Sequence, residues 1–380
     1  MRKILRLIAS ISFLQLMTSP FIQAQVKLEK VNEFRIASFE TFDIVDYDPE
    51  KKNYLAYAPR VSGFEVVVID EKGRVLSKKN LQGQGPEQFN SALNFLGFSG
   101  SENILVITPN ELITYDNQLN YKGRKKLLVE DIFVTSRLTS APIFYYPEDK
   151  QGKQVYAVAP SLTSVFMTVS SLENQFLVKF FDPDSNKQIS FLPLKDRSIY
   201  GKLDKSVFPM YAPIVTIDRN KKTLYATATL DGEISVMDIP SGKVISTVKI
   251  NHGKFGSFNK FPVSDRSLSS YSQYTLASMN QKLVSIEDGV FVLDYVREIE
   301  KEVFERNYQE DPKYHHFQDP KYHRMIFFDE KIQLSNDIPM PKNGKLMISL
   351  PGNRLLFKIV DPEVELDFIR YEVYKVVLNK

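Results

Sequence analysis

Three of the four histidines lie in one short stretch that could hold a metal ion or move a proton. His315, His316 and His323 belong to a tandem Asp-Pro-Lys-Tyr-His repeat, which also supplies Tyr322 and two aspartates. Zinc sites place histidines one helical turn apart or use paired Cys and His spacings, and the two prolines keep this stretch extended. An ordered loop, a ligand or partner contact, and a metal or acid–base site remain open. We predict a ligand or partner contact at His315, His316, Tyr322 and His323, and we predict no metal site.

The glycine-rich stretch NLQGQGPEQF, residues 80–89, could in principle bind phosphate. A phosphate-binding loop needs a lysine and a hydroxyl after its last glycine. Here Gly85 is followed by Pro86, which lacks an N–H, and by Glu87, which would repel phosphate. We therefore interpret the stretch as a crossover between structural units. That role is assigned to Gly83, Gly85, Pro86, Glu87 and Phe89.

The remaining signals of catalysis are weak. The chain has no cysteine, which excludes disulfides, thiol catalysis and a lipid anchor on an N-terminal cysteine. It also lacks a Gly-x-Ser-x-Gly elbow and a His-Glu-x-x-His pair. The sequence favours a non-enzymatic protein without a cofactor. The alternative is a lyase or hydrolase with a metal near a central channel, using His252 or the 315–323 stretch.

Residues 1–24 have the layout of a secretory signal peptide. Residues 1–6 are basic, residues 7–17 are apolar, and Ala24 is the small residue before a cleavage site. The apolar run is shorter than the about 20 residues of a membrane span. We expect cleavage after Ala24 and export of residues 25–380 as one domain. The predicted location is the periplasm or the outer membrane, without a lipid anchor and without a transmembrane span.

Cleavage also changes the charge balance. The whole chain has 49 Lys and Arg against 46 Asp and Glu, a net charge of +3. Residues 1–24 hold three basic residues and no acid, so the exported chain is neutral. A neutral chain lacks the basic surface that nucleic-acid binding needs. We expect a protein, peptide or glycan partner in the cell envelope and no nucleic acid.

The elements that must position these residues recur along the chain. Six short runs of β-forming residues end in an aspartate, at Asp70, Asp116, Asp182, Asp238, Asp294 and Asp361. A strand-like run and a turn containing Gly, Asn or Asp precede each of them, and several lead through a second turn into another strand. An aspartate that opens a turn bonds the backbone two residues on. We therefore predict that these aspartates shape turns.

Six such units predict an all-β fold, a six-bladed β-propeller of four-stranded antiparallel blades. A pair of β-sandwiches, the competing fold, would not need six similar units. Residues 31–37 are the expected closing strand, paired with residues 370–378. The charge-dense segment 295–311 has apolar residues at helical spacing. It predicts a short helix inserted after the third strand of the fifth unit, either packed on the rim or used to dock a partner.

The glycine–proline motif also carries a resemblance. Gly83, Gly85, Pro86, Glu87 and Phe89, after a Gly-Arg-Val-Leu strand, resemble a motif of exported six-bladed propellers of Gram-negative bacteria, related to the TolB-like and NHL-type propellers. The resemblance covers residues 30–380. It implies a fold and a compartment, and it implies no established reaction.

Overall fold

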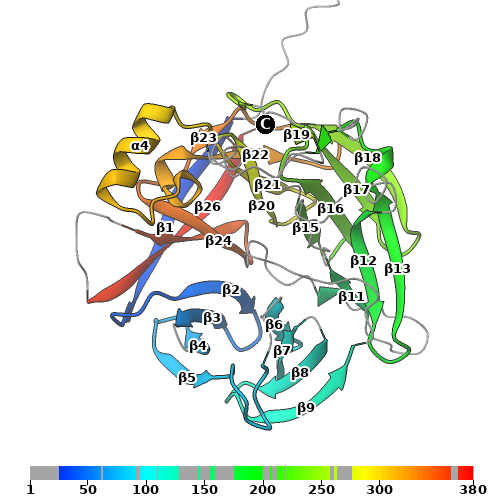
Figure 1. Cartoon of the computed structure of the whole chain (residues 1–380), viewed down its shortest axis with the longest axis vertical. Coiled ribbons are helices and arrows are strands. Elements are labelled where there is room, and N and C mark those ends of the chain that lie inside the picture. The colour runs from blue at the N-terminus through cyan, green and yellow to red at the C-terminus, as the bar shows by residue number, and fades with distance from the viewer. Residues whose placement is uncertain are drawn as a thin grey trace, which may run out of the picture.

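The described residues form six four-stranded antiparallel sheets around a central axis, so the protein is an all-β six-bladed propeller (Figure 1). The computed structural model describes residues 25–60, 63–90, 95–108, 110–127, 144–145, 155–158, 175–199, 206–207, 212–218, 220–256, 261–262, 276–360 and 367–379. The predicted signal peptide and Asp361 lie outside them.

Each sheet is one blade, numbered in chain order and given from its innermost strand outward. Blade 1 contains β2 (Asp43–Asp48), β3 (Asn53–Arg60), β4 (Gly63–Asp70) and β5 (Val75–Asn80). Blade 2 contains β6 (Phe95–Ser99), β7 (Asn103–Ile107), β8 (Glu111–Asp116) and β9 (Tyr121–Lys126). Blade 3 contains β10 (Phe144–Tyr145), β11 (Val155–Val158), β12 (Phe176–Asp182) and β13 (Lys187–Pro193).

The second half of the chain continues the series. Blade 4 contains β15 (Pro213–Asp218), β16 (Thr223–Ala228), β17 (Glu233–Asp238) and β18 (Lys243–Lys249). Blade 5 contains β20 (Met279–Ser285), β21 (Phe291–Val296), β22 (His323–Phe328) and β23 (Ile338–Pro339). Blade 6 contains β24 (Gly344–Leu350), β25 (Arg354–Ile359), β26 (Phe368–Asn379) and β1 (Gln25–Ala37).

A few elements lie outside the blades. The strands β14 (Ser206–Val207) and β19 (Phe261–Pro262) form a separate two-stranded ribbon. The helical elements of the described residues are α4 (Lys301–Glu310) and the 3-10 helices η2 (Leu194–Asp196), η4 (His316–Gln318) and η5 (Pro320–Tyr322). Within the ranges described, no helix is long and apolar enough to cross a membrane.

The first and last strands of the chain pair with each other and close the ring. β1 runs antiparallel to β26, with Phe34 opposite Tyr371 and Ile36 opposite Ile369. The rings of Phe34 and Tyr371 stack with their centroids 5.1 Å apart. The Tyr371 hydroxyl also donates to the carbonyl oxygen of Phe42, 2.7 Å away in the chain segment that leads into blade 1. The predicted closing strand is therefore confirmed.

The core lies between the blades. Six clusters of buried apolar side chains each join neighbouring blades, and the cluster between blades 5 and 6 contains the fully buried Phe327 and Phe357. Because both faces of a blade are covered in this way, middle strands such as β16 and β21 are buried along their whole length. Removing this apolar surface from water is the main stabilising term, at about 25 cal/mol per Å².

The predicted turn role of the aspartates is confirmed in blades 1 to 4. The Asp70 carboxylate accepts from the backbone N–H groups of Lys72 and Arg74, both at 2.9 Å. Asp116 and Asp182 accept from the N–H two residues on, and Asp238 accepts from the N–H three residues on. These aspartates end the third strand of their blades.

In blades 5 and 6 the repeat is displaced by one strand. Asp294 lies inside β21, the second strand of blade 5, and the run before Asp361 lies in β25, the second strand of blade 6. The turn role predicted for Asp294 is therefore wrong. The helix α4 likewise follows the second strand of blade 5, not the third, because it lies between β21 and β22 in the chain. None of its residues is buried, and it lies at the edge of the molecule (Figure 1).

Candidate functional site

The glycine-rich stretch connects the outer strand of blade 1 to the inner strand of blade 2. The Gly83 N–H donates to the carbonyl oxygen of Phe89 at 2.9 Å, and the Phe89 N–H donates to that of Leu81 at 2.9 Å. The Phe89 ring is fully buried among side chains of both blades. The side chain of Gln88 closes the loop, since its Oε1 accepts from the Gly85 N–H at 3.0 Å and its Nε2 donates to the Asn80 carbonyl oxygen at 3.2 Å.

The polar groups of this loop are occupied by neighbouring blade residues. Arg124 of β9 donates to the carbonyl oxygens of Pro86 and Gln88, both at 2.9 Å, and the Tyr115 hydroxyl donates to that of Glu87 at 2.7 Å. Among the described residues, the Glu87 carboxylate forms a single ion pair, with Lys79 at the surface and at 3.3 Å. The organising side chain is therefore Gln88, which the sequence interpretation did not single out. A Cβ on Gly83 would lie 2.2 Å from the Gln88 Oε1, which explains the glycine.

His323 and His316 are buried and bonded within blade 5 and its loops. The Nδ1 of His323 lies 2.7 Å from the Asp294 carboxylate and its Nε2 lies 2.9 Å from the carbonyl oxygen of Phe317. Burial acts to lower the pKa of His323, but the Asp294 carboxylate outweighs it and holds that pKa above its usual value. The Nε2 of His316 lies 3.2 Å from the Ala277 carbonyl oxygen, and burial lowers the pKa of His316 to about 4.

The other histidines do not join this pair in one site. His315 is half-buried and stacks on Phe317 with centroids 4.9 Å apart, and Tyr322 is half-buried beside His316. His252 follows blade 4 and contacts the Asn280 Oδ1 at 2.9 Å, and burial lowers its pKa to about 4. Across the described part of the chain, no three His, Asp or Glu side chains are grouped so that they could hold a metal ion.

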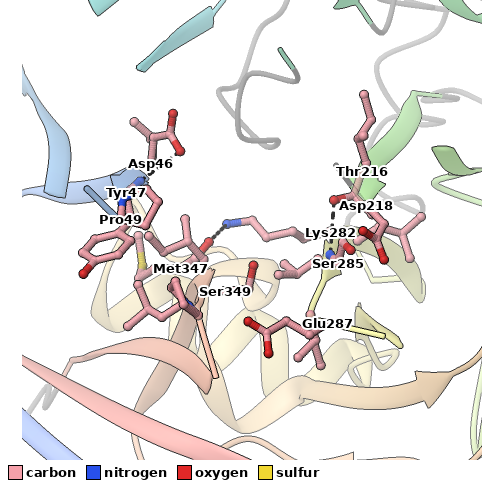
Figure 2. Close-up of a pocket in the computed structure, with 18 of the residues that line it drawn as sticks. Asp46, Tyr47, Pro49, Thr216, Asp218, Lys282, Ser285, Glu287, Met347 and Ser349 are labelled. Carbon is pink, nitrogen blue, oxygen red and sulfur yellow. Dashed lines mark hydrogen bonds between the residues drawn. The ribbon is translucent and has the colours of Figure 1, made fainter. Parts of the chain in front are cut away.

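A cavity of about 270 Å³ lies where the innermost strands of four blades meet. Its walls are the carboxyl-terminal halves of β2, β15, β20 and β24 and the first residues after them, so it lies at the end of the propeller axis where these strands finish (Figure 2). Three of these inner strands contain a bulge, with a register step at Val45 in β2, Gln281 in β20 and Met347 in β24. Bulges re-aim side chains, and here they adjoin the cavity.

Lys282 is the cationic residue of the cavity wall. Figure 2 shows its side chain crossing from β20 toward Met347. Its Nζ donates to the carbonyl oxygens of Leu346 and Met347, at 3.2 and 3.0 Å. Burial, with a smaller contribution from the charge of Lys345, lowers the pKa of Lys282 to about 8. No carboxylate of the described residues forms an ion pair with it.

Carboxylates and hydroxyls line the rest of the cavity. The Asp218 carboxylate accepts from the N–H groups of Asn220 and Gly289, at 3.0 and 3.2 Å. The Glu287 Oε1 accepts from the Gly352 N–H at 2.8 Å. The Ser285 N–H donates to a threonine hydroxyl of β15 at 3.2 Å. The Ser285 Oγ is buried and has no hydrogen-bond partner in the part of the chain described here.

An ion-pair network acts on Lys282 from the neighbouring strands. Asp43 at the start of β2 binds Lys358 at 2.8 Å and Lys345 at 3.0 Å, which joins blades 1 and 6. Burial acts to raise the pKa of Asp43, but the two lysines hold it well below its usual value. Sequence reasoning did not find this cavity. The available signal was Lys282 itself, a lysine inside the inner strand MNQKLVS.

Comparisons with known proteins show the fold. No family model matches the chain, and no curated protein shows significant sequence similarity to it. A crystal structure of a DUF4221 family member from Bacteroides vulgatus is 11% identical, has a TM-score of 0.69, and the match covers 94% of this chain and 99% of that one. At this identity the likeness shows a shared fold and does not assign an activity to this chain.

Two further solved structures are more distant. One, from Bacteroides fragilis and described as an exported protein, has 11% identity, a TM-score of 0.49 and coverage of 94% of this chain and 96% of its own. The other, BamB from Moraxella catarrhalis, has 11% identity, a TM-score of 0.40 and coverage of 92% and 100%. The family relationship inferred from the glycine–proline motif stays a prediction.

Proposed function

We propose that this protein is an exported, non-enzymatic binding protein of the cell envelope that takes part of a protein, peptide or glycan partner into the mouth of its axial channel. The observation that carries the proposal is the cavity between β2, β15, β20 and β24. Within the described residues, the wall holds an ammonium group whose hydrogen bonds go to backbone carbonyls and a buried hydroxyl that has no partner. Buried polar groups are normally satisfied, so an unsatisfied one in a cavity wall favours a ligand that satisfies it.

The metal-dependent alternative has less support. A lyase or hydrolase would need His252 or the 315–323 stretch to meet carboxylates around a metal. In the residues described, His252, His316 and His323 each bond to a different part of the blades. The binding role predicted for His315, His316, Tyr322 and His323 and the cleavage after Ala24 stay predictions that the cavity does not address.

A pull-down from the native envelope tests the proposal. The bait is the full exported chain, compared with Ser349→Trp, which fills the cavity, and with Ile189→Trp, a matched change on the exposed side of β13. We expect quantitative mass spectrometry to find partners that wild type and Ile189→Trp retain and Ser349→Trp loses. Equal retention by all three, or loss only with Ile189→Trp, would place the binding surface away from the channel and contradict the proposal.

A further inference from the structure

We propose that the axial cavity is a receptor for a single carboxylate, held by the ammonium of Lys282, on a ligand that is otherwise neutral or positively charged, such as the carboxyl end of a short peptide. This inference rests on the proposed function and specifies the chemistry of the ligand.

The hydrogen bonds of Lys282 leave its charge available to a ligand. An ammonium group has three N–H donors, and two of those on Lys282 reach the carbonyl oxygens of Leu346 and Met347. Both acceptors are neutral, so the positive charge stays uncompensated by direct contact. The nearby lysines differ in this respect, because Lys345 and Lys358 both bind Asp43. A partly buried cation with a free donor is a favourable place for an anion, since charge-assisted hydrogen bonds are roughly twice as strong as neutral ones.

The hydroxyl of Ser285 has no partner among the described residues. Ser285 lines the same cavity and is 7% exposed. Its backbone N–H already donates to the hydroxyl of Thr216, so the Oγ is the polar group of Ser285 that a ligand could bind. A bound molecule with polar groups beyond its carboxylate would satisfy it.

The other charged groups of the cavity determine which charge the rest of the ligand can carry. Besides Lys282, the charged side chains lining the cavity are Asp46, Asp218 and Glu287, all acidic. They would repel a ligand carrying several carboxylates, such as a polyuronate, and would attract an ammonium group. A cavity of about 270 Å³ also lies near the lower end of the range for ligand pockets, roughly 300–1,000 Å³. It fits the end of a short chain better than a branched glycan.

The pH dependence of binding follows from the same groups. The charges that act on Lys282 from the packed elements are Lys345 of β24, Asp294 of β21 and Asp43 of β2. Asp294 is bonded to His323, and Asp43 to Lys345 and Lys358. Burial lowers the pKa of Lys282 to about 8, so its ammonium group loses its proton as the pH rises above that value. The affinity for a carboxylate should therefore fall about tenfold per pH unit above that value.

Calorimetric titration of the full exported chain tests the inference. The probes are tri-alanine with a free carboxylate, its carboxyl-terminal amide, and tri-galacturonate. The variants are Lys282→Met and the matched surface change Lys301→Met on α4, with thermal unfolding used to check that each is folded. We expect tri-alanine to bind, and its affinity to fall at least tenfold on amidation and with Lys282→Met but not with Lys301→Met.

Three results would overturn the inference. The first is that the tri-alanine amide binds as tightly as tri-alanine. The second is that folded Lys282→Met binds tri-alanine with unchanged affinity, and the third is that tri-galacturonate binds more tightly than tri-alanine. No binding of any probe at millimolar concentration would also overturn it. The proposed function would survive each of these results if Ser349→Trp still lost envelope partners, so the two failures are distinguishable.

Discussion

The ammonium of Lys282 in blade 5 lies 3.0 Å from the backbone carbonyl oxygen of Met347 in blade 6, so one side chain joins two blades across the wall of the axial cavity. The bulge positions of both strands adjoin this contact, with Gln281 before Lys282 and Met347 itself as the extra residues. One extra residue sends the following side chains to the opposite face of a strand. The bulges are therefore what places a lysine at this position of the channel.

The stability of the fold should depend on the charge of Lys282. Burial lowers its pKa from the ordinary 10.5 of a lysine to about 8 in the folded protein, so the unfolded chain binds more protons between these pH values. The free energy of unfolding therefore rises with pH from about 8 to 10.5 through this group, by on the order of 3 kcal/mol. Denaturant titrations of wild type and Lys282→Met should show this rise in wild type only. A parallel rise in both proteins would contradict the assignment.

Acid should destabilise the protein through His252. Burial lowers its pKa to about 4, so the unfolded chain takes up the proton first as the pH falls through 6.5. The stability contributed by the neutral ring is present above pH 6.5 and is lost between about 6.5 and 4, by roughly 1 kcal/mol per pH unit at most. His252→Gln keeps a side chain that can bond to Asn280 and removes the titration. Its unfolding free energy should fall less than that of wild type over this interval, measured by urea denaturation.

The buried pair of Asp294 and His323 should be strongly coupled. Replacing Asp294 with Asn leaves the imidazole without its counter-charge, and breaking a buried ion pair in this way costs about 3–5 kcal/mol. A double-mutant cycle with Asp294→Asn and His323→Gln should show a coupling energy above about 1 kcal/mol at pH 6. The coupling should decline as the pH rises through the elevated pKa of His323, because that pairing is complete only below it. Additive effects at pH 6 would show that the contact carries no energy of its own.

The crossover loop should depend on Gln88 and Phe89 more than on Glu87. Phe89→Ala removes a fully buried ring between blades 1 and 2 and should cost about 3–5 kcal/mol. Gln88→Ala should cost about 1–3 kcal/mol by leaving the Gly85 N–H and the Asn80 carbonyl oxygen without this partner. Glu87→Ala loses one exposed ion pair and serves as the matched control, expected to change stability by less than about 1 kcal/mol. A larger cost for Glu87→Ala than for Gln88→Ala, measured by denaturant unfolding, would reverse this assignment.

The sequence predicted those features that local chemistry determines. The turn aspartates of blades 1 to 4 and the closing pair β1 and β26 follow from turn chemistry and strand propensity, and both are present. In blade 5 the strand that ends in aspartate is the second strand and not the third, and local chemistry could not predict this. There α4 and its flanking loops separate β21 from β22, and the outer strand β23 has only two residues, so no short hairpin marks the third strand.

The cavity escaped sequence reasoning for a different reason. Hydrophobic patterns assign a lysine to solvent, whereas Lys282 reaches the channel through a bulge and is held by the backbone of another blade. The contacts of its neighbours are equally non-local, as Asp43 and Lys358 are far apart in the chain and 2.8 Å apart in the fold. Such long-range contacts form only when the six blades close into a ring, so no local sequence motif predicts them.

The most direct test of the central claim is the pKa of Lys282 itself, measured from its side-chain carbon shift by NMR in protein made with labelled lysine and assigned with Lys282→Arg. We predict a pKa near 8 in the free protein. Addition of tri-alanine should raise it by at least one unit, because the bound carboxylate stabilises the ammonium form, and the tri-alanine amide should leave it unchanged. A pKa that stays the same with and without tri-alanine, or that already lies near the ordinary value of a lysine in the free protein, would contradict a carboxylate receptor in the axial cavity.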